Sequence, residues 1–289
     1  MYKVAILGCE NSHADAFLDL VINKRIVTDI EFAGVYSDDA AAAEKLNAKF
    51  GVYAAKSYDE FVGKIDGLII TARHGDNHYR YAKPYIESGI PMFIDKPITV
   101  SESDAIAFMR ELKAAGVKAC GGSSCVHAKY IKELKDIIAS GESGRVLGGD
   151  LRAPISMDNP YGGFFFYSQH LVQVMCELFG YYPKSVRAFV NDKKYSFVVR
   201  YDDYDVWASF IEGNYVYAAG VSLEKRYLGG TYDLDNCYEA EFMEFYHLLT
   251  GGEQHTAYRE IIAPVYILNA MYRALKSGNE ETVNPAEEI

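Results

Sequence analysis

The chain has 289 residues, which is long for one hydrophobic core and comfortable for two, so we expect two domains with a cleft between them. Its formal net charge of -11 at pH 7, without a basic stripe, excludes a surface for nucleic acid or anionic membranes and favours a small polar ligand. No apolar run is long enough to span a membrane and no signal-peptide pattern opens the chain, so we expect a cytoplasmic protein.

In the first half, short β-branched apolar runs alternate with amphipathic stretches, which predicts a parallel sheet flanked by helices. Strands are expected at residues 4–7, 30–36, 52–53, 67–70, 92–94 and 118–120. Helices are expected to begin near residues 12, 38 and 57, and to span about 77–88, 101–116 and 128–140. This half is predicted to be an α/β, Rossmann-like dinucleotide-binding domain, assigned to residues 1–122.

In the second half, strand candidates follow one another with short links, which predicts a mostly antiparallel open sheet. The strands are expected at residues 146–153, 184–191, 194–202, 204–212 and 214–222, and helices at about 164–179, 238–250 and 256–276. We assign residues 123–289 to an α+β domain that binds substrate. The run from Tyr215 to Ala219 has apolar residues on both sides, so we expect this sheet to form a homodimer or homotetramer.

The turn after the first strand, residues 8–13, reads GCENSH and keeps only Gly8 of the dinucleotide fingerprint GxGxxG. Glu10 adds a side chain and a charge where backbone normally approaches the pyrophosphate, and His13 is bulky where a glycine allows close packing. Two interpretations stay open. In a shortened turn, Asn11, Ser12 and the helix amino terminus would donate to phosphate while Glu10 points to solvent. Otherwise the turn is degenerate and binds no cofactor.

The second strand ends at Ser37, where dinucleotide-binding domains usually carry the acid that holds the adenosine ribose. Serine removes the charge that excludes a 2′-phosphate, yet Asp38 and Asp39 follow and no arginine is adjacent to accept that phosphate. The choice between NAD and NADP therefore stays open. Ser37 is also a suitable amino-terminal cap for the next helix, and both roles are compatible.

Thr71 begins the segment that follows the strand at residues 67–70, on the same sheet edge as Gly8. This segment contains His74 and His78, which lie four residues apart. We expect no metal site there, because the segment begins in a loop, lacks an HExxH pattern and has no suitably spaced cysteines. His78 is expected to line the cleft or to begin a helix.

Asp95, Lys96 and Pro97 follow the strand at residues 92–94, where an open α/β sheet binds its ligand. An ammonium at this position suits proton transfer or the anchoring of a hydroxyl. In the second half, His170 lies on an apolar helix that two glycines precede. It is either a buried structural histidine or, at the expected domain cleft, a functional one.

The ordered set of these motifs resembles the Gfo/Idh/MocA family of NAD(P)-dependent oxidoreductases over nearly the whole chain. The resemblance rests on Thr71 with His78, Asp95-Lys96-Pro97, the segment 140–146, and Gly162-Gly163 with His170. It implies hydride transfer between NAD or NADP and a sugar, inositol or similar polyhydroxy substrate, with Lys96 bonding the reacting hydroxyl and His170 as acid and base. The cofactor-binding residues it implies are Gly8, Asn11, Ser12, His13, Ser37, Thr71, His78, Asp95 and Lys96.

Three positions depart from the family pattern: the glycine fingerprint, Ala72 in place of a proline, and Phe166 in place of the aspartate that precedes the histidine. Tyr167, Asp158 and His127 are possible substitutes for that aspartate, and no spacing selects among them. Besides a dehydrogenase, two hypotheses stay open. One is a non-catalytic ligand or dinucleotide sensor, and the other is a lyase or hydrolase with a tightly held nicotinamide.

Overall fold

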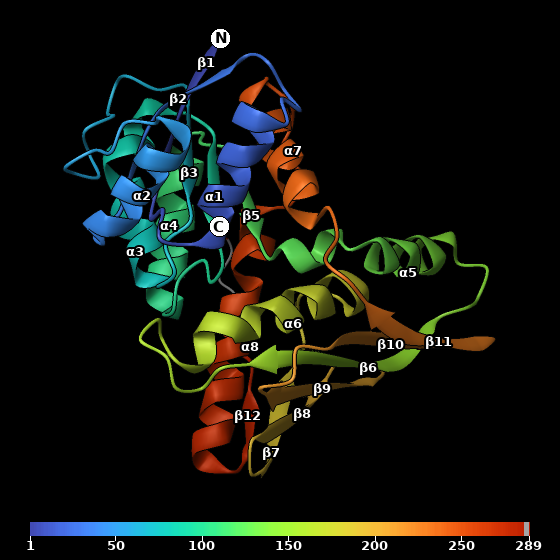
Figure 1. The fold of residues 1–289 in the computed structure, drawn as a ribbon. Helices are drawn as coiled ribbons and strands as arrows, with labels where there is room; N and C mark the ends of the chain where they lie inside the picture. The colour runs from blue at the N-terminus through green and yellow to red at the C-terminus, as the bar shows by residue number, and fades with distance from the viewer. Residues whose placement is uncertain (286–288) are drawn as a thin grey trace.

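Two β-sheets, each with its own helices, organise the chain in the computed structural model, which describes residues 1–285 and 289 (Figure 1). The first sheet has five strands in the order β2-β1-β3-β4-β5, and every pair is parallel. Both β3 and β4 are fully buried, as expected for a parallel sheet covered on its two faces. The strands are β1 (Tyr2–Leu7), β2 (Ile30–Tyr36), β3 (Gly67–Ile70), β4 (Met92–Asp95) and β5 (Ala119–Gly122).

The helices of the first sheet alternate with its strands in the chain. Strand order reverses between β1 and β3, and in such sheets the ligand crevice opens at the carboxyl ends on either side of that reversal. The turns after β1 and β3 therefore face the expected site. The helices are α1 (Ser12–Leu18), which continues as a π-helical turn (Asp19–Asn23), α2 (Ala40–Phe50), α3 (Asp76–Ala82), which continues as a 3-10 turn (Lys83–Ser88), and α4 (Glu102–Ala114).

The second sheet has seven strands in the order β11-β10-β6-β9-β8-β7-β12. All its pairs are antiparallel except β6 with β9. The chain crosses one face as α6 (Phe164–Phe179) before β7 begins, so the β7-β8-β9 meander returns with β9 parallel to β6. The strands are β6 (Val146–Ile155), β7 (Ser185–Asn191), β8 (Lys194–Arg200), β9 (Asp205–Glu212), β10 (Tyr217–Leu223), β11 (Arg226–Tyr232) and β12 (Glu280–Thr282).

This arrangement confirms the predicted fold class of a Rossmann-like parallel sheet followed by a mostly antiparallel one. Some local predictions are wrong. The strand expected at 52–53 is only a single bridge between Val35 and Ala54, shortly after Gly51 caps the end of α2. The helix expected from Ser57 is a series of turns. Strands β11 and β12 were not predicted, since one contains Gly229 and Gly230 and the other has only three residues.

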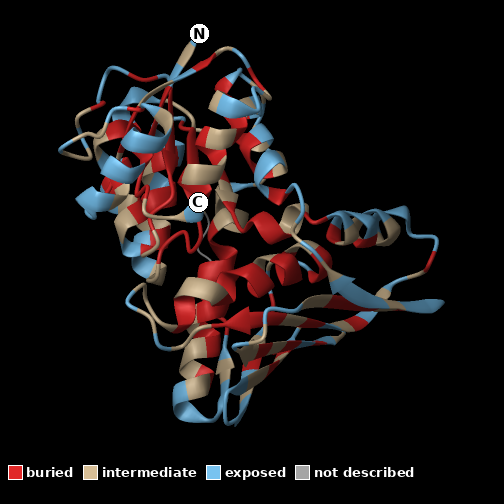
Figure 2. Ribbon diagram, viewed as in Figure 1, coloured by how far each residue is buried: buried red, intermediate tan, exposed pale blue. Residues whose placement is uncertain are grey.

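Helix α6 lies between the two sheets and is buried along most of its length (Figure 2). Helix α7 (Cys237–Leu249), although late in the chain, packs against α1. The Phe17 and Phe242 rings, with centroids 5.4 Å apart, carry this contact in the core of the first sheet. The remaining helices are α5 (Lys129–Ser140), α8 (Tyr258–Ser277) and a 3-10 turn (Ser124–His127). Among the described residues, no helix has the length and apolar character needed to cross a membrane.

Candidate active site

Lys96 follows β4 directly, and its ammonium is buried against the first turn of α6. The Nζ atom donates to the carbonyl oxygen of Phe166 at 3.3 Å and lies 4.4 Å from the centroid of the Phe166 ring and 5.7 Å from that of Tyr167. Burial lowers the pKa of Lys96, while the charge of Asp95 opposes that shift. The structure thus brings the lysine of the first domain to the helix that carries His170.

His170 is buried, and its Nδ1 atom lies 2.7 Å from the Ser123 hydroxyl and 3.5 Å from the Cys125 sulfur. Burial, with the positive charge of Lys96, lowers the pKa of His170 well below its usual range. The imidazole is therefore neutral near pH 7. Ser123, directly after β5, thus provides the close polar partner of this ring in the structure.

Of the three residues considered as substitutes for the family's aspartate, only Tyr167 contacts the His170 ring among the described residues. Tyr167 meets His170 edge to face, with ring centroids 5.3 Å apart. His127 faces Glu244 at 3.5 Å, and Asp158 lies in the loop before α6. Ser123 was missed by sequence analysis, although its position after a parallel strand that ends in Gly122 was a usable signal.

Glu10 folds back against the neighbouring turns, so the one interpretation in which its side chain points to solvent is wrong in that detail. Its carboxylate accepts hydrogen bonds from the Ser37 hydroxyl at 2.7 Å and from the backbone N–H of Arg73 at 3.0 Å. The tight turn at Gly8 makes this possible: Gly8 has φ +75°, and a Cβ there would come within 2.3 Å of the Ala72 nitrogen. The turns after β1 and β3 therefore touch, and Glu10 connects them to the end of β2.

Asn11 and Ser12 connect the same turn to β4 and α7. The Asn11 amide donates to Asp95 Oδ2 at 2.7 Å, and the Ser12 hydroxyl lies 3.2 Å from that of Tyr238. Both residues also line a large pocket at this edge of the sheet. Their role in binding a cofactor stays a prediction, and the contact with Tyr238 depends on the docking of α7.

His13 lies between two buried carboxylates, with Nδ1 3.4 Å from Asp95 Oδ2 and Nε2 3.3 Å from Glu241 Oε2. Burial raises the pKa of Asp95 to about 6 and that of Glu241 well above its usual value, and it lowers the pKa of His13. Within the described part of the chain, these three residues form the one group whose ligand-type atoms lie within 4.8 Å of one another. The charge of Lys96 lowers the pKa of both carboxyl groups and so opposes the effect of burial on them.

Thr71 and His78 connect the loops after β1, β3 and β4 through contacts with backbone carbonyl oxygens. The Thr71 hydroxyl donates to the Gly8 carbonyl at 3.1 Å. The His78 ring lies between the carbonyl oxygens of Pro97, 2.7 Å from Nδ1, and Ala72, 2.8 Å from Nε2. Burial lowers the pKa of His78 to about 4, against the opposing effect of these carbonyls. His78 is fully buried and does not line the cleft, so it acts on the site through these backbone contacts.

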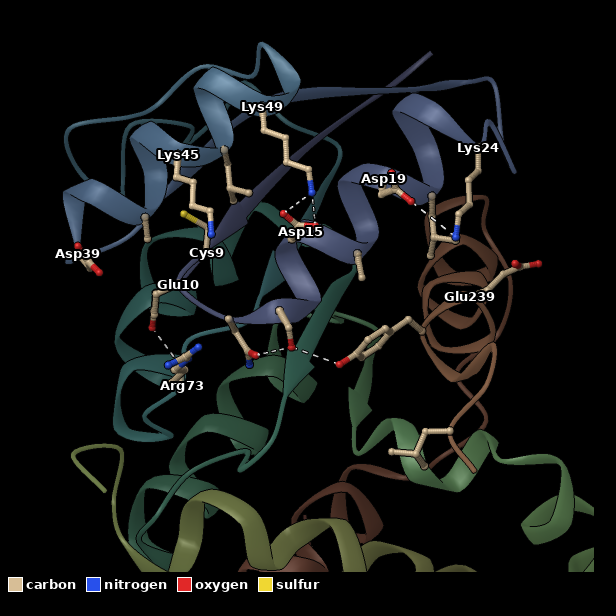
Figure 3. A pocket seen from close by; sticks show the side chains of 18 of the residues that line it. Cys9, Glu10, Asp15, Asp19, Lys24, Asp39, Lys45, Lys49, Arg73 and Glu239 are labelled. Carbon is tan, nitrogen blue, oxygen red and sulfur yellow. Dashed lines mark hydrogen bonds and ion pairs between the residues drawn. The ribbon is translucent and has the colours of Figure 1, made fainter. Parts of the chain in front are cut away.

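A groove of about 1,090 Å³ opens between the turn after β1, α1, α2 and α7 (Figure 3). Lys49 and Lys24 on its walls pair with Asp15 and Asp19 respectively. Lys45 also lines the groove, and among the described residues no ion pair involves it. A second pocket of about 460 Å³ adjoins this groove; both are lined by Glu10, Asp39 and Tyr161.

The fold and site define a class: a protein of two sheets whose Rossmann-type parallel sheet carries a lysine at its carboxyl edge, in contact with the helix that carries a histidine. Residues 2–122 match the family model described as oxidoreductase family, NAD-binding Rossmann fold, Gfo/Idh/MocA. This match over the amino-terminal part of the chain confirms the resemblance found from its motifs.

Similar proteins of known sequence or structure agree with this assignment. YhhX of Escherichia coli strain K12, named an uncharacterised oxidoreductase, is 22% identical over 185 residues, or 61% of this chain and about half (53%) of its own length. A scyllo-inositol dehydrogenase from Lactobacillus casei superposes with a TM-score of 0.86 at 13% identity, covering 98% of both chains.

Two further solved structures share the fold over the full length. A myo-inositol dehydrogenase from Corynebacterium glutamicum has a TM-score of 0.84 at 16% identity and covers 99% of this chain and 100% of its own. GenD2 from gentamicin A biosynthesis, crystallised with NAD, has a TM-score of 0.83 at 14% identity and covers 98% and 96%. At these identities the likeness extends to the fold, and both domains share it.

Proposed function

We propose that this protein is an NAD(P)-dependent oxidoreductase that oxidises a CH–OH group of a sugar, inositol or similar polyhydroxy compound. The observation that carries the proposal is the meeting of Lys96, from the end of β4, with the turn of α6 that leads to His170. The family of the amino-terminal domain and the inositol dehydrogenases among the similar structures support it.

The residues around the groove fit a dinucleotide. Its volume of about 1,090 Å³ is at the upper end of the range for small-molecule sites. Asn11 and Ser12 offer polar groups at the turn after β1, and Lys45 offers a cation for the phosphates. A bound nicotinamide ring supplies the hydride acceptor.

The proton chemistry follows from the contacts of His170. When its Nδ1–H donates to Ser123, Nε2 carries the lone pair, and the low pKa keeps the ring neutral and able to accept a proton. His170 would take the hydroxyl proton of the substrate while the carbon loses its hydride, so a carbonyl forms. The Lys96 ammonium would donate to the same oxygen and stabilise its developing negative charge.

A matched pair of lysine variants tests this proposal. Purified protein is mixed with NAD or NADP and a panel of polyols, and reduced nicotinamide is measured by absorbance. Lys96→Ala should reduce turnover by about 10²-fold or more. Lys129→Ala should leave it unchanged, since that side chain is 90% exposed on α5. Full activity of Lys96→Ala in a folded protein would exclude Lys96 from the mechanism.

A second candidate, a non-catalytic dinucleotide or ligand sensor, is favoured by one observation. The Lys96 ammonium already donates to the Phe166 carbonyl oxygen and lies over the Phe166 ring, at the position where the family pattern has an aspartate. Saturable binding of NADH with no turnover of any polyol in the same panel would support the sensor.

We further propose a homo-oligomer through the exposed face of the second sheet. Phe189 on β7 and Trp207 on β9 are 46% and 52% exposed, and their rings stack on each other at 6.4 Å between centroids. Large apolar side chains grouped on one sheet face are typical of a subunit interface. Phe189 and Trp207 form the exposed patch of this sheet.

A further inference from the structure

We infer that Glu10 is the carboxylate that binds the adenosine ribose hydroxyls of the coenzyme, and that it restricts this protein to NAD rather than NADP. The inference rests on the proposed function, because it assumes that a dinucleotide occupies the groove. It assigns a ligand-binding role to a residue that replaces the second glycine of the fingerprint.

The Glu10 carboxylate lies at the end of β2, beside Ser37. Dinucleotide-binding sheets usually supply the ribose-binding acid from the end of the second strand, and here that position is Ser37. Glu10 reaches the same place from the turn after β1, because its Oε2 accepts the Ser37 hydroxyl at 2.7 Å. Ser37 in turn accepts the N–H of Asp39 at 3.0 Å, so the direction of its own proton toward Glu10 is determined. Glu10 therefore comes from a different position in the sequence than the usual ribose-binding acid, but its carboxylate lies at the same position in the fold.

The Glu10 carboxylate also keeps free hydrogen-bond acceptor sites for a ligand. An ionised carboxylate has about four acceptor sites. The Ser37 hydroxyl and the Arg73 N–H occupy one site on each oxygen of Glu10, at 2.7 Å and 3.0 Å. About two sites therefore remain, which matches the two vicinal hydroxyls of a ribose. These two bonds also hold the side chain rigidly, so little further ordering is needed when a ligand binds.

The adjoining pocket is lined by several acidic side chains. Four carboxylates line this pocket of about 460 Å³, and the one basic side chain among its lining residues, His74, lies 3.7 Å from Asp76. Arg80, which could otherwise pair with a phosphate, is bound to Asp38. A 2′-phosphate carries up to two negative charges and would meet repulsion here, whereas ribose hydroxyls would meet acceptors. The four carboxylates belong to Glu10, Asp38, Asp39 and Asp76.

Binding titrations test the inference without any need for a substrate. NADH and NADPH are titrated separately into the full-length protein, and nicotinamide fluorescence is recorded. We expect wild type to bind NADH at least about 10-fold more tightly than NADPH. Glu10→Gln, which keeps the size but removes the charge, should weaken NADH binding about 10-fold and bring the NADH/NADPH ratio close to one. Glu44→Gln, exposed on α2, should bind both as wild type does.

A second variant keeps the inference testable if Glu10→Gln does not fold. Ser37→Ala removes the donor that holds Glu10 while leaving the charge, so NADH binding should weaken by a smaller factor and preference for NADH should persist. Circular dichroism and a thermal melt establish that each variant is folded.

The outcomes separate this inference from the proposed function. Equal affinities of wild type for the two coenzymes, or an unchanged ratio in folded Glu10→Gln, would overturn the role of Glu10 and leave the oxidoreductase standing. Binding by Glu10→Gly where wild type binds neither coenzyme would show that the carboxylate blocks the groove, which also overturns it. Failure of wild type, Glu44→Gln and every Glu10 variant to bind either coenzyme would instead count against the proposed function.

Discussion

The Nδ1 atom of His170 lies 2.7 Å from the hydroxyl oxygen of Ser123, and this contact connects α6 to the end of β5. A hydroxyl can set the tautomer and the direction of an imidazole, but it brings no negative charge. A carboxylate at this point would raise the pKa of the ring, whereas here burial and Lys96 lower it. The Ser123 hydroxyl therefore orients the His170 ring without raising its pKa.

Removing the Ser123 hydroxyl should slow the proposed reaction without weakening substrate binding. We expect Ser123→Ala to lower kcat about 10-fold with KM unchanged, because the ring loses the partner that fixes its tautomer. Ser123→Thr keeps a hydroxyl and should recover most of the activity. Steady-state kinetics with the polyol found active in the panel measures both constants.

The control for this prediction is Ser103→Ala, which removes an exposed hydroxyl on α4 and should change neither constant. A rise in KM equal to the fall in kcat/KM, with kcat intact, would contradict the positioning role of Ser123.

The raised pKa of Asp95 predicts a specific pH dependence of stability. The folded-state pKa of about 6 exceeds the unfolded value of 3.8, so the folded protein keeps the proton to higher pH. The resulting stabilisation is present below pH 3.8 and is lost as pH rises through about 6. Relative to Asp95→Asn, wild type should lose about 1 to 3 kcal/mol of unfolding free energy over this interval.

Urea unfolding of both proteins at several pH values measures this difference. Asp203→Asn is the control, since that aspartate is exposed and its variant should follow the wild-type curve. The groups that face Asp95 are His13, Lys96 and Glu241, from α1, the end of β4 and α7. The prediction fails if the free energies of unfolding of wild type and Asp95→Asn change in parallel from pH 4 to pH 6. That result would show that these groups keep Asp95 ionised in the folded protein.

The clamp formed by His78 predicts a large loss of stability. His78→Leu removes the imidazole between the carbonyl oxygens of Ala72 and Pro97, one of which accepts the single N–H of the neutral ring and would be left buried without that donor. We expect a loss of about 2 to 4 kcal/mol in the free energy of unfolding, measured in urea. His74→Leu, four residues earlier and about one third exposed, should change stability by less than about 0.5 kcal/mol. A similar loss in both variants would argue against the clamp.

Local patterns in the sequence were sufficient for the layers and for the position of Lys96. The alternation of strand and helix signals gave the parallel sheet, and an apolar run that ends in Asp95 placed the next residue at its ligand-binding edge. Helix α6 was predicted with its observed ends because glycines stand on both sides of its apolar run.

The contacts that complete the site were not predictable in this way. Glu241 and Tyr238 reach it only because α7 crosses back to pack on α1, and no local period records a contact over more than 200 residues. The direction of Glu10 depends on how closely Gly8 lets two turns approach. Both are consequences of tertiary packing, which a single sequence does not display.

The exposed patch on the second sheet predicts a change of mass on mutation. Trp207→Glu places a charge beside Phe189 in the proposed interface, where it would be buried without a partner. Size-exclusion chromatography with light scattering should therefore report a larger species for wild type and a shift toward the monomer for the variant. Val62→Glu, 43% exposed on the first domain, should keep the wild-type mass. A monomeric wild type would refute the interface, and an unchanged mass for Trp207→Glu would place it on another face.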